Sequence, residues 1–293
     1  MPEALREGRV TAVYGRRYLV QAAGEEFACV TRGKKGGVAC NDCVEFRPTA
    51  SSEGVIEEVL PRKSLLWRSD ALRAKLIAAN VDQVLVVTAP VPTPRQELLD
   101  RCLVAAEAAG IPALILANKA DLPESAPYVK RLRAYERLGY PVLALSARQD
   151  VTALRQRLTD QVSVLVGASG MGKSTLINAL LPHARAATAE TSLALDAGRH
   201  TTTHTRFYEL PEGGGIIDSP GMQEFGLRHL SLDELQAAYP EFRRLRGRCR
   251  FHDCRHLQEP GCAVLAAVQS GDILPMRWRV YRDLVRENSQ TRF

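Results

Sequence analysis

A glycine-rich stretch past the midpoint of the chain has the residue types of a phosphate-binding loop. Gly167-x-x-x-x-Gly172-Lys173-Ser174 follows an apolar run and opens an amphipathic segment. Glycines let backbone N–H groups approach phosphate oxygens, and the start of a helix favours an anion. In this pattern the lysine reaches the β- and γ-phosphates and the serine hydroxyl binds Mg²⁺. The stretch therefore predicts a P-loop.

A second motif, upstream of the first, could recognise the base of a nucleotide. Asn118, Lys119 and Asp121 follow the apolar run 113–117. A carboxylate in the last position accepts hydrogen bonds from the N1 and N2 donors of guanine, which adenine does not offer there. Ser146 and Ala147 end a further apolar run and match the short loop that lies behind the base. These residues predict GTP as the nucleotide.

Two further segments come after the P-loop. Asp218-Ser-Pro-Gly221 follows an apolar run, so that Asp218 is expected to hold Mg²⁺ through water and the Gly221 N–H to sense the γ-phosphate. The polar segment 198–204 can bring a threonine to the same ion. The order is base reader, base loop, P-loop, first switch, second switch, which predicts a circularly permuted GTPase fold. Permutation leaves the spatial neighbours of a fold unchanged.

Cysteine and histidine residues near the C-terminus have the types and spacing of a zinc site. Cys249, Cys254, His256 and Cys262 lie within 14 residues, and three thiolates with one imidazole make a closed tetrahedral set. We therefore expect one structural zinc ion per chain, with His252 as the competing imidazole. Arginines surround the set and suggest an RNA contact, although an ordinary solvated surface would also carry them.

Short alternating runs fill the first 60 residues and predict a small five-stranded barrel. Residues 61–70 break this pattern and are predicted to be a linker. From about residue 71, apolar runs alternate with helical patterns, which predicts a parallel sheet covered on both faces. We expect three domains: the barrel at 1–62, the permuted α/β GTPase at 63–235, and a zinc-binding helical module at 236–293.

The totals agree with a globular protein of several domains. The chain has 293 residues, 45% of them hydrophobic, and a net charge of +6, which is compatible with an acidic partner such as nucleic acid. No apolar run approaches the ~20 residues of a membrane-spanning helix, and the N-terminus lacks the apolar core of a signal peptide. We therefore expect a cytoplasmic protein with no membrane partner, and a monomer by default.

Together these motifs resemble the ribosome small subunit-dependent GTPase A family over nearly the whole chain. The resemblance lies in "AANVDQVLVV", "NKADL", "GASGMGKSTLIN", "GRHTTTHT", "DSPGMQEFGL" and the cysteine–histidine signature. It implies an N-terminal barrel of the oligonucleotide-binding (OB) type, GTP hydrolysis stimulated by the small (30S) ribosomal subunit, and a role in late maturation of that subunit with contacts to its 16S rRNA. It also implies that the nucleotide, GTP or GDP, governs binding and release.

The resemblance implies functions for individual residues. It implies that Ser174, Thr202 and Asp218 support Mg²⁺. It implies that Cys249, Cys254, His256 and Cys262 bind zinc. Nucleotide-binding roles fall on Asn118, Lys119, Asp121, Ser146, Ala147, Gly167, Ala168, Ser169, Gly170, Met171, Gly172, Lys173, Ser174 and Thr175.

Hydrolysis by the free protein is expected to be slow. Met222 stands where Ras-type enzymes have a glutamine that orients the attacking water, and a thioether is only a weak hydrogen-bond acceptor. The resemblance points to His200 as the catalytic residue that positions the water once the first switch is ordered. Gln223 is the weaker candidate, one residue out of register.

Two other functions fit the same motifs. One is an RNA-binding switch whose GTP turnover is incidental. The other is a permuted GTPase that acts on the large subunit or on another RNA. Turnover with added small subunits separates the first from the leading hypothesis, and co-sedimentation with each subunit separates the second.

Overall fold

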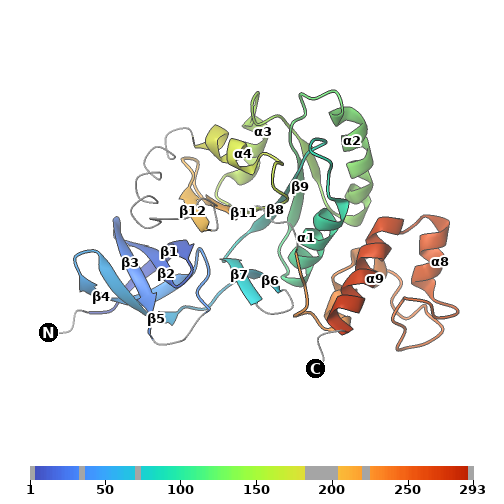
Figure 1. Ribbon diagram of the computed structural model, residues 1–293, viewed down its shortest axis with the longest axis horizontal. Helices are drawn as coiled ribbons and strands as arrows, with labels where there is room; N and C mark the ends of the chain where they lie inside the picture. The colour runs from blue at the N-terminus through green and yellow to red at the C-terminus, as the bar shows by residue number, and fades with distance from the viewer. Residues whose placement is uncertain (1–3, 33–36, 70–73, 182–203, 220–224, 290–293) are drawn as a thin grey trace.

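The structure, a computed structural model, describes residues 4–32, 37–69, 74–181, 204–219 and 225–289. A β-barrel at the N-terminal end, a central α/β part and a C-terminal helical part follow one another across the molecule (Figure 1). This arrangement confirms the multidomain fold class. The domain boundaries after residues 62 and 235 stay predictions.

The N-terminal barrel consists of five strands and has its own core. The strands are β1 (Arg6–Tyr14), β2 (Arg17–Ala22), β3 (Glu25–Thr31), β4 (Cys43–Ala50) and β5 (Glu53–Val59). Their order is β1-β2-β3-β5-β4, and pairing of β1 with β4 closes the barrel. Phe27 and Phe46 meet in its centre with ring centroids 5.0 Å apart. Gly54 lies so close to this core that a Cβ there would be 2.8 Å from the Phe46 ring.

The segment predicted to be a linker contains a strand instead. Strand β6 (Leu65–Ser69) pairs antiparallel with β7 (Ala74–Ala79). Leu66 is buried, and the Trp67 ring stacks on His229 with 3.8 Å between centroids. The linker prediction was wrong because this short strand is stabilised by a partner strand and by His229, about 160 residues away, and neither appears in the local pattern.

The central part is a sheet that is parallel except for β12. Its strands are β8 (Gln83–Thr88), β9 (Ala113–Ala117), β10 (Val142–Ala144), β11 (Val162–Val166), β12 (Thr205–Glu209) and β13 (Gly215–Asp218), in the order β10-β9-β8-β11-β13-β12. The strand before the P-loop, β11, therefore lies between β8 and β13. This order places the carboxyl ends of β9, β10, β11 and β13 at one edge of the sheet, although they are far apart in the chain.

Helices cover both faces of this sheet (Figure 1). They are α1 (Gln96–Ala108), α2 (Ser125–Leu132), the 3-10 helix η1 (Arg133–Leu138), α3 (Thr152–Leu158) and α4 (Lys173–Leu180). The Arg155 guanidinium ties α3 to α4 by donating to the Ala179 and Leu180 carbonyl oxygens at 2.9 and 2.8 Å. Helix α1 faces the C-terminal part of the chain.

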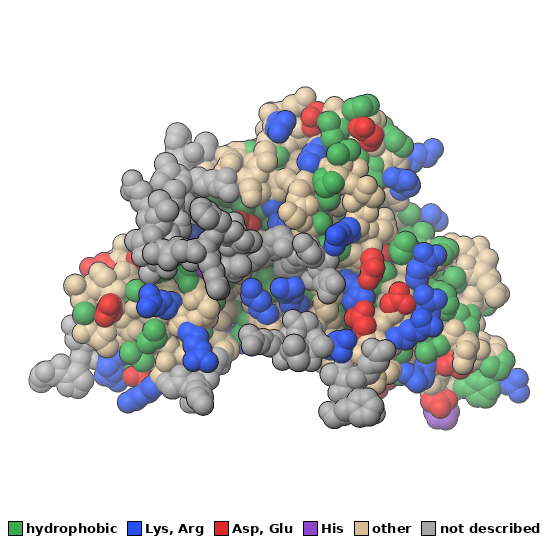
Figure 2. All heavy atoms as spheres, viewed as in Figure 1, with side chains coloured by type: hydrophobic (Ala, Val, Ile, Leu, Met, Phe, Trp, Pro, Cys, Tyr) green, Lys and Arg blue, Asp and Glu red, His purple; other side chains and the backbone are tan. Residues whose placement is uncertain are grey.

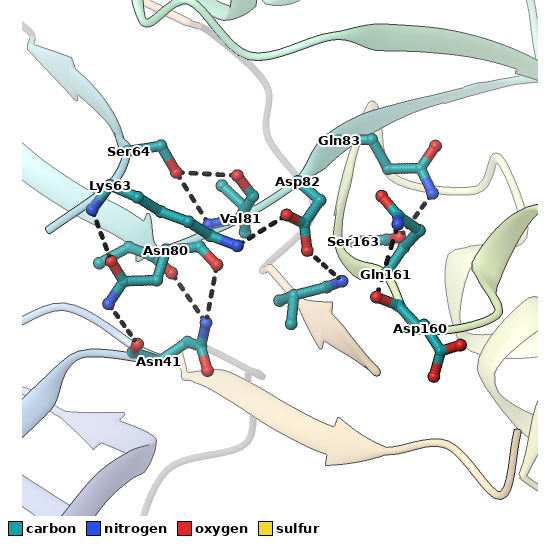
Figure 3. Close-up of polar contacts among 12 residues, drawn as sticks. Asn41, Lys63, Ser64, Asn80, Val81, Asp82, Gln83, Asp160, Gln161 and Ser163 are labelled. Atoms are coloured by element: carbon teal, nitrogen blue, oxygen red, sulfur yellow. Dashed lines mark hydrogen bonds and ion pairs between the residues drawn. The ribbon is translucent and has the colours of Figure 1, made fainter. Parts of the chain in front are cut away.

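Two joints hold the barrel against the central sheet. Strand β1 pairs with β12, the strand that follows the predicted first switch, so the barrel and the sheet are continuous. The second joint is a reciprocal pair: Asn41 Nδ2 donates to the Asn80 carbonyl at 3.2 Å, and Asn80 Nδ2 donates to the Asn41 carbonyl at 3.1 Å (Figure 3). Both asparagines have positive φ, 67° and 54°, a conformation that asparagine tolerates well.

The second joint continues into the sheet. Lys63 Nζ pairs with Asp82 at 2.6 Å, and the other carboxylate oxygen of Asp82 accepts from the Val162 N–H at 2.8 Å (Figure 3). Because Val162 opens β11, a short chain of polar contacts runs from the barrel to the strand that carries the P-loop.

The C-terminal part is helical, with α6 (Leu232–Ala237), α7 (Pro240–Arg243), α8 (Ala263–Ser270) and α9 (Pro275–Ser289). Ser231 and Glu234 form a capping box at the start of α6. Arg277 on α9 is fully buried and joins this part to α1: its guanidinium contacts Glu241 at 2.7 and 3.1 Å and Asp100 at 3.4 Å. None of the helices in the described ranges combines the length and apolar character needed to cross a membrane.

Asp100 is expected to make the protein more stable in mild acid than at pH 8. Burial raises the pKa of its carboxyl to about 6, and Arg277, which also pairs with Glu241, offsets this only in part. Because the folded pKa exceeds the unfolded value, the extra stability is complete below about pH 4 and is lost as the pH rises through 6. Between pH 4 and pH 8 the parent should therefore lose about 3 kcal/mol of stability relative to Asp100→Asn, which has no carboxyl to titrate at this position.

Urea unfolding at several pH values from 4 to 8 measures this effect. The parent should lose stability relative to Asp100→Asn as the pH rises, whereas Asp283→Asn, a half-exposed position on α9, should follow the parent. A difference in stability between the parent and Asp100→Asn that stays constant from pH 4 to pH 8 would contradict the assignment.

Candidate nucleotide site and metal centre

The glycine-rich stretch forms the turn between β11 and α4. Gly172 has φ +92°, and a Cβ at this position would lie 2.3 Å from Asn118 Nδ2, so only glycine fits. The buried Lys173 folds over its own loop and donates from Nζ to the Gly167 and Ala168 carbonyl oxygens at 2.8 and 2.9 Å. The ammonium group therefore lies within the turn that is expected to surround the phosphates.

Burial lowers the pKa of Lys173, and the nearby Asp218 carboxylate opposes this shift. Asp218 ends β13, in register with Leu165 of the neighbouring β11. An acidic side chain thus lies beside the P-loop lysine, as an ion-binding carboxylate would. Ser174 is exposed in the first turn of α4.

Asn118 connects three of the predicted motifs. Its side-chain N–H donates to the Met171 carbonyl of the P-loop at 3.0 Å, and its side-chain oxygen accepts from the Ala147 N–H of the base loop at 3.0 Å. Lys119 also reaches the P-loop, because its Nζ donates to the Gly170 carbonyl at 2.8 Å. Residues that are 53 positions apart in the chain therefore meet at one edge of the sheet.

Asp121 is exposed beside this junction. A hydrogen bond from the Ser146 side chain lowers the pKa of the Asp121 carboxyl, which is therefore ionised at neutral pH. Ser146 is itself buried, so it can hold the carboxylate in a fixed position. An anchored, solvent-facing carboxylate is what recognition of two N–H donors requires.

The structure also describes the remaining P-loop residues. Ser169 and Gly170 are exposed at the tip of the loop, Thr175 is half-buried on α4, and the Ala168 and Met171 side chains are buried under the loop. His200, Thr202, Gly221, Met222 and Gln223 lie outside the described residues.

The four cysteine and histidine residues of the C-terminal part come together. Their ligand atoms lie within 4.8 Å of one another, with His256 Nδ1 3.6 Å from Cys249 Sγ and 3.4 Å from Cys262 Sγ, and these two sulfurs 4.0 Å apart. A tetrahedral zinc ion with ordinary bond lengths separates sulfurs by about 3.8 Å and sulfur from nitrogen by about 3.5 Å. The four residues therefore fit a metal ion.

The histidine of this cluster is His256, not His252. The Trp278 indole N–H donates to the His256 carbonyl at 2.9 Å, and the Tyr281 hydroxyl donates to the Arg255 carbonyl at 2.7 Å, so α9 supports the backbone here. His252 is exposed. Cys40 and Cys43 of the barrel take no part in the cluster; Cys40 is buried and Cys43 is exposed.

Comparison with known proteins decides the family. Residues 59–228 match the family described as RsgA GTPase, which is more than half of the chain. The chain belongs to the RsgA GTPase family. It is therefore a GTP hydrolase, and the prediction drawn from its motifs is confirmed at this level.

The likeness to individual RsgA proteins extends beyond the matched segment. The chain is 51% identical over 280 residues to the small ribosomal subunit biogenesis GTPase RsgA of Nitrosospira multiformis, covering 95% of this chain and 90% of that protein. It is 52% identical over 270 residues to the protein of the same name from Neisseria meningitidis serogroup B, covering 92% and 88%.

Two solved structures share the whole architecture. YjeQ from Thermotoga maritima has a TM-score of 0.71 and 30% identity, covering 97% of this chain and 99% of that one. YloQ, described as a circularly permuted GTPase, has a TM-score of 0.69 and 27% identity, covering 99% and 97%. The permuted order expected from the motifs is thus confirmed.

In this RsgA family member, the residues that contact the segment Phe225–Leu230 were not identified from the sequence. This segment follows the predicted second switch. Arg101 of α1 donates to the Phe225 carbonyl at 3.4 Å and pairs with Glu287 of α9 at 2.5 and 2.9 Å. Asn288 of α9 donates to the Leu227 and Leu230 carbonyl oxygens at 3.3 and 2.8 Å.

Strand β6 also contacts this segment. The Ser69 N–H donates to the Gly226 carbonyl at 2.9 Å, and the Ser69 hydroxyl accepts from the His229 N–H at 3.0 Å. No spacing rule connects residues 69, 101, 226 and 288, so no sequence signal could have grouped them.

Proposed function

We propose that this GTPase binds the small ribosomal subunit during its late maturation and uses GTP hydrolysis to control its release. The observation that carries the proposal is the likeness of more than 90% of the chain, at 51–52% identity, to proteins named small ribosomal subunit biogenesis GTPase. Likeness limited to the nucleotide site would support only the use of GTP. Because the barrel and the C-terminal part are also alike, we infer that this protein binds the same ribosomal subunit as those relatives.

In the proposed nucleotide site, Asp121 accepts from guanine N1 and N2 while Ser146 and Ala147 lie behind the base. Lys173 exchanges its two carbonyl partners for phosphate oxygens, which attract an ammonium group more strongly because they are charged. Ser174, Asp218 and Thr202 support Mg²⁺, which neutralises charge on the phosphates when it is bound.

Water positioning is assigned to His200. The sequence places no glutamine directly after Gly221, so another group has to orient the attacking water. His200 precedes three threonines of the first switch, so contact with the ribosome could order it together with the magnesium-binding Thr202. Gln223 remains the weaker candidate.

The contacts of Phe225–Leu230 support a route from the nucleotide to the C-terminal part. This segment follows directly on the second switch and is held by both Arg101 and Asn288, and Arg101 also pairs with Glu287 on α9. A change in the second switch would therefore be transmitted to α9 through these hydrogen bonds. The β1–β12 pairing offers the barrel a corresponding link to the first switch.

The remaining partners follow from this proposal. The cysteine–histidine cluster holds one structural zinc ion per chain, the protein contacts 16S rRNA, and it acts as a monomer in the cytoplasm, where ribosomes mature. Zinc would fix the backbone around residues 249–262, which has few apolar side chains of its own to bury.

Small subunits are expected to raise the GTP turnover of this protein by at least about tenfold, and by up to about a thousandfold. The free protein lacks the water-orienting glutamine, whereas the bound protein gains an ordered first switch. Phosphate release, measured with and without purified small subunits and with large subunits as the control, tests this. Exchanging His200 for alanine should abolish the stimulation and leave GTP affinity within about twofold.

Each alternative function has its own outcome. Turnover that small subunits leave unchanged, with GTP-dependent RNA binding retained, would favour the RNA-binding switch. Stimulation by large subunits alone would favour a GTPase that acts on the large subunit.

A further inference from the structure

An exposed aromatic ring lies on the loop that carries the metal ligands. In the described part of the chain four large apolar side chains are exposed, and Phe251, at 40%, is the one with an aromatic ring. It stands between Cys249 and Cys254, two residues of the cluster. The Arg250 N–H donates to the Gly261 carbonyl at 3.1 Å, which ties this loop across to the other end of the cluster. This hydrogen bond and the metal ligands on either side hold the backbone that carries the Phe251 ring.

Arginines are frequent in the sequence around Phe251, and several of them form no ion pair with a residue that the structure describes. Among the described residues, Arg243 pairs with Glu107 at 3.0 Å, and the Arg244 and Arg255 side chains donate to Arg137 and Ser289. By contrast, Arg246, Arg248 and Arg250 are exposed and form no ion pair with any residue that the structure describes. The Arg250 guanidinium lies 5.4 Å from the centre of the Phe251 ring.

In the segment 243–262 the acidic groups are fewer than the arginines. Glu259 accepts hydrogen bonds from the backbone N–H groups of Arg255, Leu257 and Gln258, which fixes it within the metal loop. Asp253 is the one exposed carboxylate between Cys249 and Cys254. The end of the C-terminal part thus combines a flat apolar ring with an excess of positive charge. Its blue and green side chains lie together at the lower right of Figure 2.

We propose that Phe251, together with Arg246, Arg248 and Arg250, binds single-stranded RNA. An unpaired base stacks on the Phe251 ring, and the three guanidinium groups contact the phosphates on either side. In duplex RNA the bases are already stacked on one another, so a protruding phenylalanine finds no free base face there. An acidic protein would satisfy the arginines but would leave the ring without a flat partner.

The proposal rests on the proposed function in one respect: it takes RNA as the partner and adds where and how the C-terminal part meets it. It does not depend on GTP turnover or on which ribosomal subunit is bound. The proposed function and this inference can therefore be contradicted independently, by different experiments.

The first test measures binding by the zinc-loaded, full-length protein. Fluorescence anisotropy is recorded with a labelled, unstructured 12-nucleotide RNA and with a 12-base-pair RNA duplex. Phe251→Ala should weaken binding of the single strand by about five- to a hundredfold, since stacking on one aromatic ring contributes that much. Duplex binding should change less than twofold, and Phe251→Tyr should behave as the parent.

A second variant tests the arginines. Arg248→Ala should weaken binding of all sequences alike and lower the slope of log affinity against log salt by about one. Val30→Ala, which removes an exposed apolar side chain from the barrel, is the matched control and should leave both affinities unchanged. Zinc content and melting temperature are measured for every variant, so that a misfolded metal loop is recognised.

A loss of affinity alone does not show which residues contact the RNA, so the contact is also mapped directly. An oligonucleotide containing 5-iodouracil is cross-linked to the parent protein by ultraviolet light and the protein is digested with trypsin. Cleavage after Arg250 and Arg255 isolates residues 251–255, and this peptide should carry the cross-linked base. Cross-links confined to other peptides, or single-strand binding by Phe251→Ala within twofold of the parent, would overturn the proposal.

Two other results would also overturn it. Equal losses of single-strand and duplex binding in Phe251→Ala would indicate a site that reads phosphates only. Binding of polyglutamate but not RNA, dependent on Phe251, would indicate an acidic protein partner. If small subunits fail to stimulate GTP turnover while the cross-link to 251–255 is found, the proposed function fails and this inference stands.

Discussion

Replacing Asp121 with asparagine is expected to reverse the nucleotide preference of this protein from guanine to xanthine. The Asp121 carboxylate accepts from two guanine donors, N1–H and the N2 amino group, in the proposed site. Asparagine presents one acceptor and one donor, so its N–H groups face the guanine amino group. Xanthine has a carbonyl at this position and pairs with asparagine through both groups. A site built around such hydrogen bonds rejects the wrong partner by roughly two orders of magnitude or more.

Affinities for GTP and XTP, with the turnover of each, measure this reversal. Asp150→Asn is the matched control, because Asp150 is also an exposed aspartate of the same loop region but accepts from Thr152 at the start of α3. It should leave the preference for GTP intact. GTP affinity that is unchanged in Asp121→Asn would show that another group reads the base.

A different substitution, Ser146→Ala, tests whether the Asp121 carboxylate is held as the structure indicates. The Ser146 side chain donates to Asp121 and lowers its pKa. Ser146→Ala should therefore weaken GTP binding without admitting XTP, because the carboxylate remains but is less well positioned.

Removing the metal is expected to unfold residues 249–262 while α9 stays on α1. The metal loop depends on its ligands, since a small metal-bound segment folds only when the ion is present. Helix α9, however, is attached to α1 through the buried Arg277–Glu241 and Arg277–Asp100 contacts and through Arg101–Glu287, none of which uses a thiolate. Loss of order should therefore be local.

Hydrogen exchange with and without a zinc chelator measures this difference. Amides of 249–262 should lose protection by at least about a hundredfold, whereas those of α1 and α9 should change little. Cys254→Ser should reproduce the effect and abolish zinc binding. Cys43→Ser, at an exposed cysteine outside the cluster, should do neither. Protection of 249–262 that survives chelation would mean that packing alone orders the loop.

The sequence by itself determined the parts whose signals are local. The predicted P-loop, the predicted base-reading motif and the cysteine–histidine set each lie within a short stretch, because backbone turns and ligand geometry demand fixed residue types at short spacing. Alternating apolar residues likewise predicted the barrel strands and the buried strands of the sheet. The order of these motifs was enough to indicate the permutation.

Only the tertiary structure decided which distant residues meet. Asn118 bonds to both Met171 and Ala147, β1 adds to the sheet at β12, and Ser69 and Asn288 hold the segment after the second switch. Strand β6 was missed and Arg277 was not singled out for the same reason: their partners lie far along the chain. Periodicity and spacing report the local backbone, whereas these contacts depend on how whole elements pack, which no short stretch of sequence encodes.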